Sequence, residues 1–99
     1  MAFGVKRHEL QEWKKRVERG EIALLTHYWY EERFPGNRTI TKVGCSDLDR
    51  LAAWCVQYGL DPRYIHHREH FPHFDLIGPK QRSVLEQMGR HDLIARFRL

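Results

Sequence analysis

Short strand-like and helix-like segments alternate along this sequence, and a glycine or proline lies between most of them. Residues 22–30 are rich in aromatic and branched apolar side chains, which is typical of a half-buried strand. Residues 47–58 carry apolar side chains at helical spacing, and Gly59 follows as a helix stop. A strand at 63–67 would then close one right-handed βαβ crossover. The pattern predicts an α/β fold with a small, mainly parallel or mixed sheet of roughly three to five short strands and two or three helices.

The remaining segments continue the alternation. Residues 39–43 alternate apolar and polar side chains and could form a hairpin with the first strand. Further elements are predicted as an extended stretch at 71–77, a helix at 79–88 and a last strand at 91–99, where a helix also fits. No repeat or linker interrupts the 99 residues, so we expect a single domain.

The N-terminal segment is predicted to be a basic amphipathic helix. Leu10, Trp13 and Val17 form a narrow apolar stripe at helical spacing, and basic side chains fill the rest of the helix. The narrow stripe predicts a division into a peripheral helix over 1–20 and an α/β core over 21–99. The same stripe could hold a second copy of the chain, so a homodimer through this helix is one expected partner.

Positive charge is concentrated at the two ends of the chain. The 17 Lys and Arg outnumber the 13 Asp and Glu, yet residues 21–78 carry a net charge of −2, whereas 1–20 and 79–99 each carry +3. Basic ends of this kind favour an anionic partner, although solvated helices show the same composition. The predicted nucleic-acid contacts are the basic residues that surround the first tryptophan: Lys6, Arg7, Lys14 and Lys15.

Histidine is the second unusual feature. Four of the seven histidines lie in one eight-residue window: His66, His67, His70 and His73. Asp75 follows His73 by two residues and would share its face on a strand. Imidazoles beside a carboxylate can bind a divalent metal or transfer protons, so His66, His73 and Asp75 are candidate catalytic residues and candidate metal ligands. A polar loop without a ligand is the alternative. If all four are close together and neutral, stability should fall between about pH 7 and 5.

A possible anion site follows this window. Gly78 and Pro79 open a predicted helix, and the backbone N–H groups of a helix start attract anions. Lys80 and Arg82 add positive charge beside it. The predicted ligand-binding residues are therefore His67, Lys80, Arg82 and Arg33.

Several motifs in residues 46–89 also resemble a known family. They are Ser46-Asp47-Leu48-Asp49, Tyr64-Ile65-His66, Pro72-His73-Phe74-Asp75-Leu76, Lys80-x-Arg82 and Gly89. The segment resembles a small domain-of-unknown-function family of bacterial and phage proteins, the one numbered 4031. That resemblance implies a compact α/β domain with a polar centre at His66, His73 and Asp75, and it implies no activity. The family usually has paired aspartates after the first strand, where this chain has Tyr30-Glu31-Glu32, which argues against a metal role.

Composition excludes other classes of protein. Cys45 and Cys55 form neither a disulfide framework nor a zinc motif, which favours a reducing compartment. No apolar run approaches the roughly 18 residues of a membrane span, and the first residues lack the apolar stretch of a secretory signal. We therefore expect a cytoplasmic protein with no membrane partner.

These observations favour a binding module for a phosphate-bearing ligand, with nucleic acid as the first candidate. A small hydrolase centred on His66, His73 and Asp75 is the first alternative, either with or without a metal. A protein–protein interaction adaptor is the second. Whether the chain is an enzyme stays open, and a divalent metal is the cofactor that its residues suggest.

Overall fold

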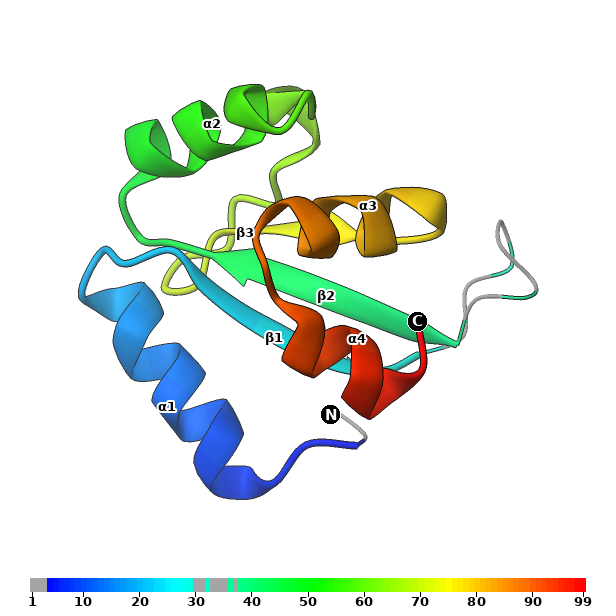
Figure 1. Cartoon of the computed structure of the whole chain (residues 1–99). Helices are drawn as coiled ribbons and strands as arrows, with labels where there is room; N and C mark the ends of the chain where they lie inside the picture. The colour runs from blue at the N-terminus through cyan, green and yellow to red at the C-terminus, as the bar shows by residue number, and fades with distance from the viewer. Residues whose placement is uncertain (1–3, 30–31, 33–35, 37) are drawn as a thin grey trace.

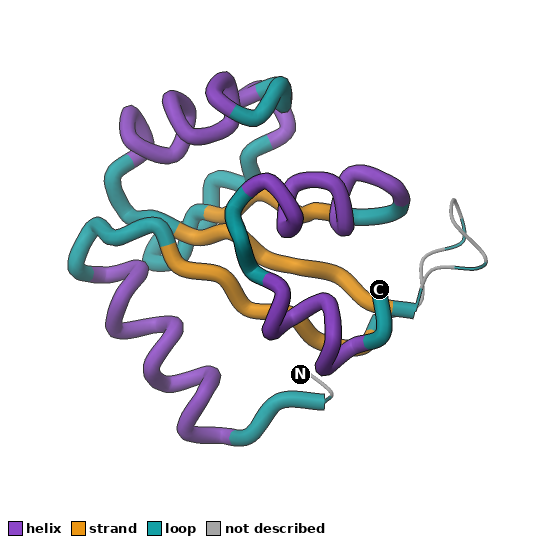
Figure 2. Tube along the Cα trace, viewed as in Figure 1, coloured by secondary structure: helices purple, strands orange, loops and turns teal. Residues whose placement is uncertain are grey.

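The computed structural model describes residues 4–29, 32, 36 and 38–99. Within these residues a central sheet is surrounded by helices, as Figures 1 and 2 show. The elements are α1 (Arg7–Glu18), β1 (Ala23–Tyr28), β2 (Thr39–Gly44), α2 (Leu48–Gln57), the 3-10 turn η1 (Pro62–Tyr64), β3 (His73–Leu76), α3 (Pro79–Gln87) and α4 (His91–Phe97). No helix among the described residues is both long and apolar enough to span a membrane.

The described strands form one three-stranded antiparallel sheet in the order β1-β2-β3. The prediction of a mainly parallel or mixed sheet is therefore wrong, and so is the βαβ crossover. The predicted hairpin between the first two strands is confirmed, and it places β2 between β1 and β3. The four α-helices of the described chain also exceed the predicted two or three.

Residues 63–67 do not form the predicted strand. Pro62 opens the η1 turn, and the Asp61 side chain accepts a hydrogen bond from the backbone N–H of Arg63 at 2.9 Å. This local turn chemistry overrides the β propensity of Tyr64 and Ile65. The chain becomes extended only afterwards, where His66 forms an isolated antiparallel bridge with β3.

The C-terminal segment is a helix, so the preference for a strand at 91–99 is wrong. Alternating apolar side chains fit both structures, but only the helical spacing lets Leu93 and Phe97 pack together against Leu85 of α3. The other predicted helices and strands are confirmed to within a few residues. Asp47 caps the start of α2, because its side chain accepts from the backbone N–H of Arg50 at 3.1 Å.

The two faces of the sheet have different coverings. On one face, Val43, Phe74 and Leu76 form the main core with side chains of α2 and α3. On the other face, Trp13 and Val17 of α1 pack against β1, and the Trp13 indole N–H donates to the Ala23 carbonyl oxygen at 2.9 Å. The apolar stripe of the first helix is thus buried within the chain. Helix α1 does not fill the part of this face beside β3, and a cavity lies there.

Candidate functional site

Strand pairing brings two of the four clustered histidines together. The His66 backbone N–H donates to the His73 carbonyl oxygen at 2.8 Å, and the return bond measures 3.1 Å. Residues bonded in this way lie opposite each other in an antiparallel pair, with side chains on the same face. Their imidazole rings stack with centroids 5.0 Å apart and an angle of 21° between planes. The backbone pairing at the edge of the sheet therefore holds the two rings side by side.

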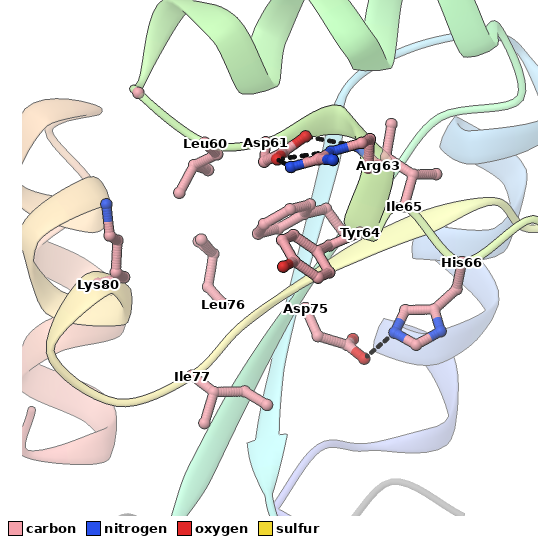
Figure 3. A pocket seen from close by; sticks show the side chains of 12 residues that line it. Leu60, Asp61, Arg63, Tyr64, Ile65, His66, Asp75, Leu76, Ile77 and Lys80 are labelled. Atoms are coloured by element: carbon pink, nitrogen blue, oxygen red, sulfur yellow. Dashed lines mark hydrogen bonds and ion pairs between the residues drawn. The ribbon is translucent and has the colours of Figure 1, made fainter.

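Asp75 completes the predicted cluster, because it lies two residues beyond His73 on β3 and shares its face. Its Oδ2 atom lies 3.1 Å from Nε2 of His66, and Figure 3 draws this interaction as a dashed line. Its Oδ1 atom lies 3.6 Å from Nε2 of His73, which is too long for a hydrogen bond. Asp75 Oδ1 is buried and has no hydrogen-bond partner among the residues that the structure describes. The structure thus brings together the three residues that the sequence singles out.

The hydrogen bond on the other side of the His73 ring determines its tautomer. Nδ1 of His73 lies 3.0 Å from the Phe71 carbonyl oxygen, and because a carbonyl only accepts, Nδ1 carries the proton. Burial lowers the pKa of His73 and favours the neutral ring. The Nε2 lone pair of this neutral ring then faces Asp75.

A cavity of about 710 Å³ lies over this cluster, between α1 and the open part of the sheet face. We call it the sheet-face cavity. Its charged and titratable lining consists of Lys14, Lys42, Arg68, His27, His66, His73 and Asp75. Its aromatic lining consists of Trp13, Trp29 and Phe71. Basic and aromatic side chains thus surround a single carboxylate.

Sequence reasoning missed His27, Lys42 and Arg68 among the lining residues, and His27 is the most deeply buried of them. It is only 3% exposed, and its Nδ1 donates to the Tyr28 carbonyl oxygen at 3.1 Å. Its Nε2 is buried with no hydrogen-bond partner in the described residues, and burial lowers the pKa of His27. The strand spacing could have identified it, because His27 lies two residues after Leu25 and therefore shares its face of β1.

A second cavity, of about 800 Å³, lies beyond His66 and Asp75 and shares both of them. Its lining is mostly apolar, and Arg63 there is neutralised by Asp61 at 2.7 Å (Figure 3). Lys80 at the start of α3 opens onto this second cavity. Although this cavity is the larger one, two of the three imidazoles, those of His27 and His73, line the sheet-face cavity and not this one.

The other predicted binding residues do not converge on one place. Arg82 is engaged by Glu86 at 2.7 Å and donates to the Leu99 carbonyl oxygen, away from the histidines. His67 and His70 are exposed and lie outside the cluster of imidazoles and Asp75, and Arg33 lies outside the described residues. Of the predicted nucleic-acid contacts Lys6, Arg7, Lys14 and Lys15, only Lys14 lines the sheet-face cavity.

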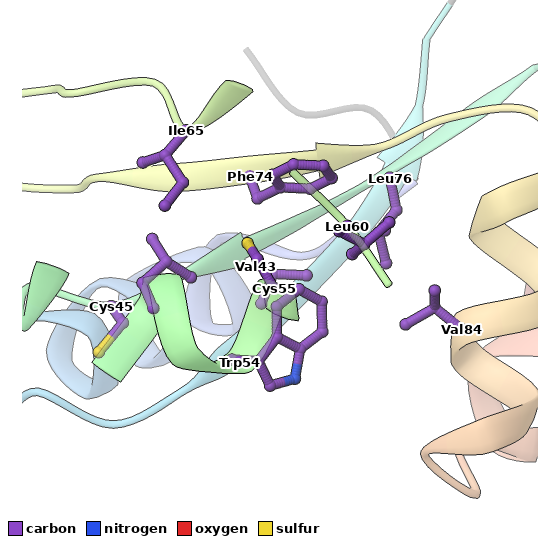
Figure 4. Close-up of a cluster of buried hydrophobic side chains, with 10 residues drawn as sticks. Val43, Cys45, Trp54, Cys55, Leu60, Ile65, Phe74, Leu76 and Val84 are labelled. Carbon is purple, nitrogen blue, oxygen red and sulfur yellow. The ribbon is translucent and has the colours of Figure 1, made fainter. Parts of the chain in front are cut away.

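The two cysteines take no part in this site. Cys45 and Cys55 are buried free thiols, and Figure 4 shows them among the apolar side chains of the main core. Burial raises the pKa of Cys45 and raises the pKa of Cys55 to about 11. Neither thiol is therefore activated as a nucleophile.

Comparison with known proteins places the chain in a family. No family model matches it, so the resemblance to the domain-of-unknown-function family numbered 4031 is not confirmed. No solved structure matches it either. The chain is 54% identical to a Bacillus subtilis (strain 168) protein with the name "uncharacterized protein YneQ", over 99 residues that cover 100% of both chains. The chain therefore belongs to the bacterial protein family that includes YneQ.

Proposed function

We propose that the sheet-face cavity binds a phosphate-bearing ligand, with a unit of single-stranded nucleic acid as the best fit. The observation that carries this proposal is the lining of the cavity. Three basic side chains, three imidazoles and three aromatic rings surround one carboxylate. Cations that contact phosphate, beside rings on which a base can stack, are the usual means of binding single strands.

The basic side chains are available to a ligand. Within the described part of the chain, no carboxylate forms an ion pair with Lys14, Lys42 or Arg68. Lys42 lies opposite Asp75 in the strand register, so it projects onto the same face as the imidazoles. Lys14 lies over the Phe71 ring, with Nζ 5.5 Å from the centroid. Uncompensated cations on a concave surface attract anions.

The aromatic side chains supply a stacking surface. Trp29 is 48% exposed at the cavity, with its ring edge-on to His27 at a centroid distance of 6.3 Å. Phe71 also lines the cavity, and its ring packs against the buried Trp13 near the start of β1, tilted by 33° with centroids 6.0 Å apart. An exposed tryptophan beside basic groups suits a base better than it suits an isolated phosphate ion.

Binding is tested by titrating the full chain with fluorescent single-stranded and double-stranded oligonucleotides at two salt concentrations. We expect tighter binding of the single strand at low salt. Lys42→Ala should weaken binding about tenfold and lower the salt dependence by roughly one ion. Trp29→Ala should weaken it by a similar factor.

The matched control is Lys15→Ala, because Lys15 lies on α1 but does not line the sheet-face cavity. It should leave affinity unchanged to within about twofold. An adenosine monophosphate competitor that displaces the oligonucleotide would support recognition of a single nucleotide unit. Lack of binding at low salt would overturn the proposal, and so would equal losses in Lys15→Ala and Lys42→Ala.

A further inference from the structure

We infer that His66, His73 and Asp75 bind a divalent transition-metal ion through two imidazole nitrogens and one carboxylate. Zinc is the metal that best suits this donor set, and its remaining coordination position would open onto the sheet-face cavity. This inference is independent of phosphate binding, because the three donor atoms can hold an ion when no phosphate-bearing ligand is bound.

The donor atoms of the three side chains lie close together. One donor atom from each of the three side chains lies within 4.8 Å of the others. The two imidazole-to-carboxylate distances are 3.1 and 3.6 Å. A tetrahedral zinc ion with bonds of about 2.0–2.1 Å separates its ligand atoms by about 3.4 Å. The two imidazole-to-carboxylate distances already match this separation, and no pair of donor atoms has to close from more than 4.8 Å.

Two acceptor atoms in the cluster, Asp75 Oδ1 and His73 Nε2, face each other without a donor between them. Within the described part of the chain Asp75 Oδ1 is buried without a hydrogen-bond partner, and such an atom destabilises a fold unless something satisfies it. The Phe71 carbonyl accepts the Nδ1 proton of His73, so the nearby His73 nitrogen offers only a lone pair. Two electron-rich atoms thus face each other across 3.6 Å, and a cation is the group that fits between them.

The support around the donors also matches a metal site. A ligating histidine typically donates its other ring N–H to a backbone carbonyl, as His73 does to Phe71. The paired backbone bonds between His66 and His73 hold both rings in register before any ion binds. The His66 side chain is 48% exposed, which gives an ion a path from solvent. Three protein ligands and an open position are typical of catalytic zinc sites, since structural sites are closed by four.

The test uses the purified full chain, stripped of metal with a chelator. Isothermal titration with Zn²⁺ should give one ion per chain, and Co²⁺ should give the visible absorption of a tetrahedral complex. His66→Ala and Asp75→Asn should each weaken zinc binding at least about tenfold. His66 is the more informative site, because its exposed side chain can be removed with little effect on folding.

Matched controls come from the same loop. His67→Ala and His70→Ala remove exposed imidazoles that lie outside the cluster, and both should bind zinc like the unmodified chain. If His66→Ala and Asp75→Asn keep full affinity, the assignment is wrong. It is equally wrong if the folded chain takes up no zinc, or if the two controls lose as much affinity as His66→Ala. Because the zinc titration contains no phosphate compound, a negative result would not contradict the proposed binding of a phosphate-bearing ligand.

Discussion

Arg96 of α4 holds Glu9 of α1 in a two-pronged ion pair, with nitrogen-to-oxygen distances of 2.6 and 3.0 Å, although 87 positions separate them. The same guanidinium donates to the Gly4 carbonyl oxygen at 2.8 Å, and Glu9 accepts from the Lys6 backbone N–H at 3.0 Å. One pair thus joins the start of the N-terminal helix to the last helix. The Arg96 hydrogen bond lowers the pKa of Glu9 to about 2.

Glu9→Gln should therefore destabilise the fold in a pH-dependent way. The Glu9 pKa in the fold lies below its ordinary value of 4.5, so the pair stabilises the fold fully above that pH. The benefit is lost as pH falls from 4.5 towards about 2. Solvent screening limits the effect to about 0.5–1 kcal/mol at pH 7. Urea unfolding at pH 7 and pH 3 should show the difference from the unmodified chain narrowing with acid.

Glu12→Gln is the control for this pair. Glu12 lies 3.7 Å from Arg16 on the exposed side of the same helix, so its loss should cost less than about 0.5 kcal/mol. An equal cost for both variants, or a Glu9→Gln effect that does not change with pH, would contradict the prediction.

Gly44→Ala should loosen the contact between α1 and the sheet. A Cβ atom on Gly44 would lie 2.6 Å from side-chain atoms of both Trp13 and Val17. Because both neighbours are buried, we expect a loss of about 1–3 kcal/mol in the free energy of unfolding. Urea unfolding followed by tryptophan fluorescence measures it. Gly36→Ala is the control, because no atom of the other described residues lies within 4 Å of its added carbon. Similar losses in both variants would disprove the clash.

Acidification should destabilise the fold through His27 and His73. Burial lowers both pKa values below the ordinary 6.5, so the unfolded chain binds more protons than the folded chain as pH falls. Stability from this source is complete above about pH 6.5 and is lost as pH falls towards the folded pKa values. Lys42 also disfavours protonation of both rings, while Asp75 partly opposes it.

The melting temperature measured from pH 8 to 5, with a chelator present, tests this prediction. His27→Gln should lose less stability on acidification than the unmodified chain. His67→Gln, which changes an exposed ring, should follow the unmodified curve. If the acid sensitivity is lost in His67→Gln and kept in His27→Gln, the assignment to the buried rings is wrong.

Local patterns determined most of the elements of this protein. Helical spacing and a stop glycine predict α2, and the Gly78-Pro79 pair predicts the start of α3, because these signals act within a few residues. The period-two spacing of His73 and Asp75 correctly predicts that they share a face. This much of the candidate site follows from the sequence alone.

Only the tertiary structure decided how β3 pairs and which residues meet. The β1–β2 hairpin is predicted from the sequence, but the antiparallel pairing of β2 with β3 is established only by their hydrogen bonds. The same pairing selects His66 from the four clustered histidines and adds His27 from a distant strand. The physical reason is range: caps and periodicity act along a few residues, whereas pairing and burial depend on segments that meet only in the folded chain.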